Sequence, residues 1–321
     1  MSIPDDPFAL TGTADVAFLE HEVQRIVGTV LRRQGVVVAV SGGIDSAVCA
    51  ALCTRALGKD RVRALSLPER HSSEASMTLA DELCARLGIP LLRFSIDPIL
   101  EAAGCYRGQE ESLRAIHPGY QAGESFKITL PSILDGDRLN LPRLTVRSSD
   151  GTEHTRRIPG GPYLQLVAST NFKQRSRTMM AYYHADRLNY AVCGTPNRLE
   201  YDQGFFVKGG DGLSDIAPIA HLFKSQVYRI AAQLGVPEGI ITRAPTTDTF
   251  PLEQTQEEFY FAAPYRAMDL CLYGLDHGSP PPAIAARTGL TETQVARIGH
   301  RVPHAPQFAA SFCRSTHHPP Q

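Results

Sequence analysis

The segment Ser-Gly-Gly-Ile-Asp-Ser at residues 41–46 contains residue types that can hold a phosphate chain. Its two glycines let the backbone turn sharply and approach a ligand closely. A helix that begins at this turn directs its free N–H groups and the positive end of its dipole at an anion. Asp45 fits beside phosphates if it holds a metal ion that the phosphates share. The alternative is a plain glycine-rich turn in which Asp45 and Ser46 cap the helix. The two serines and the aspartate at this spacing favour a phosphate loop.

The flanking sequence supplies the elements that such a loop needs. Residues 36–40 (VVVAV) are typical of a buried parallel strand, and residues 47–57 predict an apolar helix. The alternation continues with predicted strands at 61–67 and 91–96, and with a helix at 73–87 between them. This order predicts an α/β fold, a doubly wound parallel sheet with flanking helices of the Rossmann-like type.

Residues 104–165 interrupt this rhythm, because they are rich in Gly, Pro, Arg and Ser. Short β-like pieces occur at 126–130 and 144–147. We therefore predict an insertion here, either a small β excursion or a partly mobile flap. The other predictions are helices at 15–34, 169–187, 223–234, 255–274 and 281–300, a strand at 190–193, and a disordered tail at 317–321.

Composition limits the classes of protein to consider. The chain has 321 residues, 43% of them hydrophobic, and a formal net charge of −1. Nothing in this balance favours a nucleic-acid partner. No run approaches the roughly 18 apolar residues of a membrane helix, and the N-terminus has no apolar signal core. The seven cysteines are scattered and odd in number, which predicts reduced thiols in a cytoplasmic protein.

The 41–46 segment resembles the pyrophosphate loop of the ATP-pyrophosphatase (adenine nucleotide alpha hydrolase-like) superfamily. Over residues 15–103 and 166–275 the chain is similar to the ammonia-dependent NAD synthetases of that superfamily. The matching segments are NFKQRSR at 171–177, GTPNRLE at 194–200, GFFVKGGDGLSD at 204–215, PI and LFKSQ within 218–226, and a looser match at 245–257.

The resemblance implies an enzyme that uses ATP and Mg²⁺ to amidate deamido-NAD (nicotinic acid adenine dinucleotide) with ammonia through an acyl-adenylate, giving NAD, AMP and pyrophosphate. It assigns catalysis to Asp45, Ser46 and Lys224, and Mg²⁺ to Asp45 and Glu200. ATP contacts are implied for Ala39, Val40, Ser41, Gly42, Gly43, Ile44, Asp45, Ser46, Thr195, Lys224 and Thr246. Substrate contacts are implied for Arg175, Lys208 and Asp215.

The resemblance also implies a homodimer. No added glutaminase domain fits within this length, so we predict free ammonia, or a separate glutaminase partner, as the nitrogen source. We divide the chain into an NAD synthetase-like domain at 1–275, whose 104–165 insertion is a possible lid, and a C-terminal helical extension with a tail at 276–321.

Several departures concern the substrate half of the site. Val207 and Gly209 replace the usual Thr and Tyr, Gln256 replaces an acidic residue, and the family's C-terminal His-Lys-Arg has no clear counterpart. A related amide ligase that acts on another carboxylate is therefore the main alternative. A tRNA-modifying thiolase and a catalytically silent nucleotide-binding protein are weaker ones.

Overall fold

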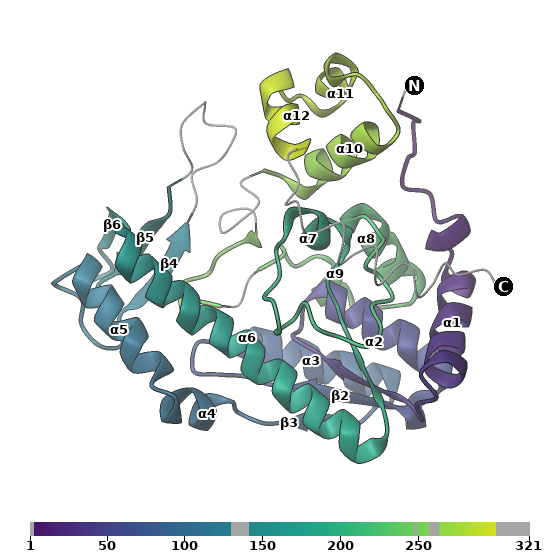
Figure 1. The fold of residues 1–321 in the computed structure, drawn as a ribbon, viewed down its shortest axis with the longest axis horizontal. Helices are drawn as coiled ribbons and strands as arrows, with labels where there is room; N and C mark the ends of the chain where they lie inside the picture. The colour runs from purple at the N-terminus through teal and green to yellow at the C-terminus, as the bar shows by residue number, and fades with distance from the viewer. Residues whose placement is uncertain (1–2, 130–140, 247–248, 257–262, 300–321) are drawn as a thin grey trace.

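A computed structural model describes residues 3–129, 141–246, 249–256 and 263–299. Its centre is a four-stranded parallel sheet with the strand order β3-β2-β1-β7 (Figure 1). The strands are β1 Val36–Ala39, β2 Val62–Ser66, β3 Leu91–Arg93 and β7 Ala191–Cys193. Because β1 and β7 are parallel neighbours, the loops that follow them leave the same edge of the sheet.

Helices cover both faces of this sheet, as the predicted doubly wound fold requires. Side chains alternate along a strand, so Val36 and Val38 pack with α1, α2 and α8, whereas Val37 packs on the other face with α4, α5 and α6. The helices are α1 Val16–Arg25, α2 Ile44–Leu57, α3 Glu74–Leu87, α4 Asp97–Ala102, α5 Cys105–Ile116, α6 Gly160–Leu188, α7 Arg198–Gln203, α8 Lys224–Gln233, α9 Glu238–Ile241, α10 Tyr265–Asp276, α11 Pro281–Thr288 and α12 Glu292–Gly299.

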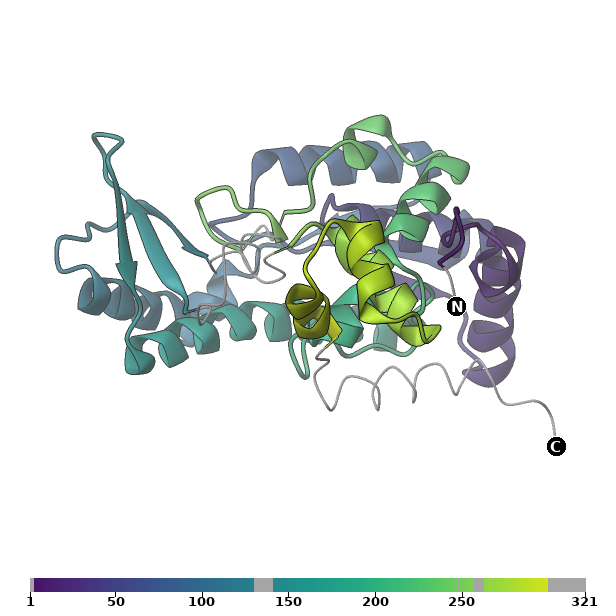
Figure 2. The ribbon, with the colours of Figure 1, turned by 90° about the horizontal axis from the view of Figure 1, so that it is seen from above.

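The predicted insertion contains a small antiparallel sheet in the order β4-β5-β6. Its strands are β4 Ser125–Thr129, β5 Arg143–Arg147 and β6 Glu153–Arg157. Phe126, Leu144 and Val146 point from it into a separate core shared with α5 and the first turns of α6. Figure 2 shows this sheet at one end of the molecule, beyond the N-terminal part of α6. The sequence indicated β4 and β5 but not β6, whose five residues are exposed and polar. It also placed the start of α6 nine residues too late.

The C-terminal helices α10, α11 and α12 pack together in another core, which includes Phe8 and Phe223. The predicted helix at 255–274 is described only in part, and the predicted tail lies outside the described residues. The division into domains at residue 275 stays a prediction. Within the described ranges, no helix is long and apolar enough to cross a bilayer.

Candidate active site

The phosphate loop joins β1 to α2 in a conformation that requires glycine. Gly42 has φ = +79°, and a Cβ atom there would lie 2.4 Å from the carbonyl oxygen of Ser76 in α3. The hydroxyl of Ser46 accepts a hydrogen bond from Ser41 N (3.2 Å) and donates one to Gly43 O (3.0 Å). Gly43 N donates to Ser41 Oγ at 3.3 Å. The serines thus fix the loop shape, and the first N–H groups of α2 face the cavity without intrahelical partners.

Asp45 is the centre of a charged cluster at the start of α2. Its carboxylate accepts hydrogen bonds from Lys224 Nζ and from Asn197 Nδ2, the latter at 3.0 Å. Asn197 and Glu200 form a capping box at the start of α7, in which Glu200 Oε2 accepts from Asn197 N at 2.9 Å. Gln256 Nε2 donates to Glu200 Oε1 at 3.3 Å. The segments after β1, β7 and the start of α8 therefore bring the predicted acidic pair and lysine together.

The electrostatics of this cluster are unusual. Burial, followed by the like charge of Asp45, raises the pKa of Glu200 to about 8, although Lys224 acts in the opposite direction. Lys224 is 2% exposed. Burial disfavours its ammonium form, but Asp45 and Glu200 outweigh burial, and its pKa is raised. The cluster therefore contains one buried cation and more acidic capacity than this cation neutralises.

Asp45 and Glu200 fit a site for a divalent cation. Their carboxylate oxygens are hard ligands, and the raised pKa of Glu200 indicates that further positive charge would stabilise its ionised form. Among the described residues, no group of three or more His, Cys, Asp or Glu side chains is arranged to hold a metal. A Mg²⁺ ion at this pair would therefore take most of its ligands from water and phosphate oxygens, as Mg²⁺ commonly does.

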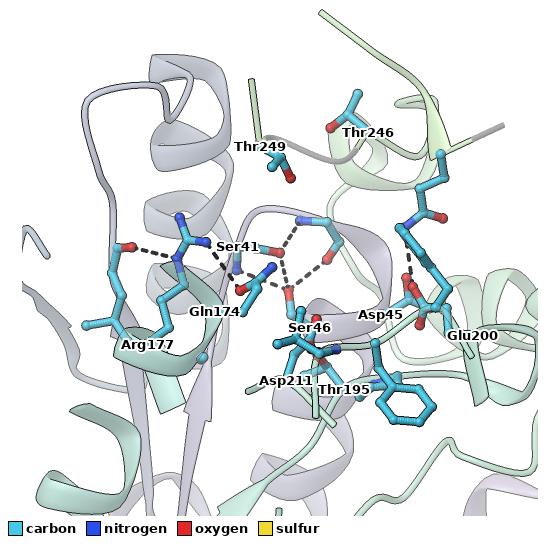
Figure 3. Close-up of a pocket in the computed structure, with 18 of the residues that line it drawn as sticks. Ser41, Asp45, Ser46, Gln174, Arg177, Thr195, Glu200, Asp211, Thr246 and Thr249 are labelled. Carbon is cyan, nitrogen blue, oxygen red and sulfur yellow. Dashed lines mark hydrogen bonds between the residues drawn. The ribbon is translucent and has the colours of Figure 1, made fainter. Parts of the chain in front are cut away.

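These residues line a cavity of about 500 Å³. In Figure 3, Arg177 lies on one side of Ser41 and Ser46, and Asp45 and Glu200 lie on the other. The predicted residues found in the lining are Ala39, Val40, Ser41, Gly42, Gly43, Ile44, Asp45, Ser46, Thr195, Glu200, Lys224 and Thr246. The insertion contributes Ile128 and Pro142 to the same cavity.

The three predicted substrate residues are not among the lining residues of this cavity. Arg175 is exposed on α6 and donates from Nε to Lys208 O at 3.1 Å, and Lys208 is also exposed. Asp215 accepts hydrogen bonds from Val192 N (2.8 Å) and from the hydroxyl of Tyr182 (3.2 Å). Asp215 thus secures β7 to α6, and substrate contacts by these three residues stay predictions.

Other residues reach the cavity without having been assigned to it. Arg177, two positions after Arg175, donates to Leu67 O at 3.0 Å and lines the cavity. Asp211 also lines it, and burial raises the pKa of its carboxyl. Arg243 donates to Ser76 Oγ at 2.9 Å. Arg177 and Asp211 stand in the family-like segments, but Arg243 follows α9 in an irregular stretch where the sequence gives no signal.

The parallel sheet, the glycine-requiring loop and the acidic pair beside a buried lysine define a nucleotide-binding α/β protein of the ATP-pyrophosphatase type. The family model for NAD synthase matches residues 13–117 and 145–307, and the chain belongs to this family.

Curated relatives agree with this assignment. An NH₃-dependent NAD⁺ synthetase of Mesorhizobium japonicum is 55% identical over 284 residues, which are 86% of this chain and 89% of the relative. One from Rhizobium rhizogenes is 47% identical and covers 92% of this chain and 90% of its own length.

Solved structures support the fold alone, because the sequence identity is low. The NMN synthetase of Francisella tularensis aligns with a TM-score of 0.57 at 23% identity over 96% of this chain and 98% of its own. The NH₃-dependent NAD synthetase of Campylobacter jejuni aligns with a TM-score of 0.56 at 23% identity over 96% of this chain and 99% of its own.

Proposed function

We propose that this protein is an ammonia-dependent NAD synthetase, which converts deamido-NAD, ATP and ammonia into NAD, AMP and pyrophosphate. The observation that carries the proposal is that the phosphate loop, Asp45, Glu200 and Lys224 all line the same cavity. Membership of the NAD synthase family and the curated relatives support the same activity.

The reaction proceeds in two steps. A nicotinate carboxylate oxygen attacks the α-phosphorus of ATP, and the bond to pyrophosphate breaks. Ammonia then attacks the acyl carbon, and the bond to AMP breaks as the nitrogen loses a proton. No nucleophilic side chain is needed, so the protein contributes positioning, charge neutralisation and exclusion of water.

Different residues of the cavity have different roles in the reaction. The first amides of α2 and the loop around Ser41 and Ser46 hold phosphate oxygens. Lys224, fixed by Asp45, supplies positive charge where charge develops on the departing pyrophosphate. Asp45 and Glu200 hold Mg²⁺, which neutralises phosphate charge when it is bound. Thr195 and Thr246 lie at the cavity wall, where their hydroxyls can contact ATP.

The exposed face of α6 supports a homodimer. Arg175, Met179 and Tyr183 follow one another at helical spacing, and Met179 and Tyr183 are each 56% exposed. Next to Tyr183, the ring of His184 stacks on Phe94, which follows the edge strand β3. A second copy that covers this apolar face would contact Arg175. Arg175 would then bind the substrate at the interface between the two copies.

The described cysteines are all free and buried, which suits the reducing cytoplasm. Ammonia reaches the site from solution or from a separate glutaminase.

One assay tests the activity directly. The purified protein is incubated with ATP, MgCl₂, ammonium and deamido-NAD, and NAD and AMP are quantified by chromatography. We expect equal amounts of NAD and AMP, and at least about 100-fold less of both from the Asp45→Asn variant. AMP formation with another carboxylic acid, and no NAD from deamido-NAD, would replace the proposal with the alternative of a related amide ligase.

A further inference from the structure

A buried lysine outside the phosphate site links three segments of the chain. Lys173 of α6 is 1% exposed, and its ammonium donates to Glu69 Oε1 at 3.0 Å. It also lies 3.1 Å from His71 Nδ1 and donates to the backbone carbonyl of Thr249 at 3.3 Å. Its three contacts therefore belong to the segment that follows β2 and to the segment at 249–256.

The charges in this cluster are complementary. Burial opposes ionisation of Glu69, but the nearby Lys173 and His71 lower the pKa of its carboxyl. Burial and then Lys173 lower the pKa of His71 to about 4, so this ring is neutral near pH 7. Because the ammonium group has no acceptor capacity, a neutral His71 accepts from it through Nδ1. The hydroxyl of Tyr106 lies 2.8 Å from the second oxygen of Glu69.

The two segments that Lys173 joins form part of the cavity wall. Ser72 and Ser76 line the cavity from one segment, and Thr249 and Phe250 line it from the other. Arg243, which precedes the 249–256 segment in the chain, makes a second tie to the region after β2, since it donates to Ser76 Oγ at 2.9 Å and to Ser73 Oγ at 3.4 Å. Arg243 near the phosphate loop and Lys173 near the insertion thus both hold this wall, together with backbone hydrogen bonds from Leu252 N to Phe126 O (3.2 Å) and from Gln256 N to Pro245 O (2.9 Å).

Stability alone is a weak reason to bury this pair. Well-packed apolar side chains often stabilise a core as well as a buried ion pair does, whereas removal of one partner leaves a buried charge and is strongly destabilising. What apolar side chains do not replace is the hydrogen bond to the carbonyl of Thr249. This bond fixes a loop backbone rather than a side chain, and Thr249 of that loop lines the cavity close to Thr246 (Figure 3).

We propose that Lys173 is a positioning residue that fastens the 249–256 segment to the cavity wall and so keeps water from the acyl-adenylate. The inference rests on the proposed two-step reaction, in which water competes with ammonia. Attack by water on the acyl carbon breaks the bond to AMP and regenerates the carboxylic acid, so ATP is consumed without amide formation. The ratio of AMP to NAD released therefore reports how well this wall excludes water.

The test compares Lys173→Met with a double variant, Lys173→Met with Glu69→Leu. The single variant leaves Glu69 buried without its cation, so we expect a lower Tm, a higher KM for ATP and at least about twofold more AMP than NAD. The double variant removes both charges and should recover much of the lost Tm, but the AMP excess should persist because the hydrogen bond from Lys173 to the carbonyl of Thr249 is still missing. Lys59→Met, the same change at an exposed lysine, serves as the control and should match the wild type.

The outcomes separate the inference from the proposed function. A double variant that keeps the wild-type ratio of AMP to NAD, or a single variant that does so, would show that Lys173 only stabilises the fold. If the wild type makes no NAD at all, the proposed function has failed instead. The role of Lys173 is then tested by pyrophosphate release, and a wild-type KM for ATP in the double variant would overturn it.

Discussion

Gly42→Ala tests whether the phosphate loop tolerates any side chain at its sharpest point. The new Cβ would lie 2.4 Å from Ser76 O, whereas ordinary contacts begin at 3.4 Å, so the loop and α3 must separate by roughly 1 Å. A left-handed conformation costs an alanine about 1–2 kcal/mol, and forced overpacking costs about 1–3 kcal/mol more. We therefore expect a loss of about 2–5 kcal/mol in the free energy of unfolding.

The same displacement should also lower the activity. A displacement of about 1 Å at reacting groups can reduce the rate by on the order of 100-fold, so we expect a comparable fall in kcat/KM for ATP. The assays are pyrophosphate release and thermal unfolding, in which Tm should fall by roughly 5–10 °C. Gly289→Ala is the matched control, because Gly289 has a similar φ of +74° but no atom within 4 Å of the added Cβ.

The control should lose only the backbone term of about 1–2 kcal/mol and keep full activity. If Gly42→Ala retained both the Tm and the kcat/KM of the wild type, the contact between Gly42 and Ser76 would not constrain the loop, and the steric reasoning would be refuted.

Three further predictions concern charge. Asp45→Asn should reduce pyrophosphate release at saturating ATP by at least about 100-fold, because Lys224 loses its carboxylate partner and the proposed Mg²⁺ site loses a carboxylate oxygen; release near the wild-type rate would remove Asp45 from catalysis. Burial raises the pKa of Asp269 to about 6, so the folded state binds the proton of this carboxyl more tightly than the unfolded chain does. The free energy of unfolding should therefore fall by up to about 3 kcal/mol as the pH rises from 4 to 6. Urea titrations should show a smaller fall for Asp269→Asn, and equal slopes would contradict the assignment. Arg175→Ala should raise the KM for deamido-NAD about tenfold and leave the KM for ATP unchanged; a change in the ATP constant alone would argue against a substrate role.

Local sequence patterns were sufficient for much of the fold. The β-branched run at 36–40, the glycines and the apolar helix after them specify one strand-loop-helix unit, because each choice depends on neighbours a few residues away. The same is true of α3, which the sequence placed within one residue of its start. By contrast, β6 has no buried face, and its sequence therefore lacks the alternation of apolar and polar residues that would indicate a strand. Its pairing with β5 is visible only in the structure.

The residues of the phosphate half of the site were also accessible from the sequence. The loop at 41–46 is contiguous, and family-like segments pointed to Glu200, Lys224 and Thr246, all of which line the cavity. The sequence by itself thus determined the parallel sheet, the phosphate loop and the family.

Only the tertiary structure decided which of the remaining side chains face the cavity. Arg175 and Arg177 are two residues apart on α6, and helical geometry turns the first toward solvent and the second toward Leu67 and the cavity. The link from Lys173 to Thr249 joins positions 76 residues apart, and no local pattern encodes it. The physical reason is that such contacts arise from the packing of whole elements, which brings together side chains whose sequence neighbours give no sign of the encounter.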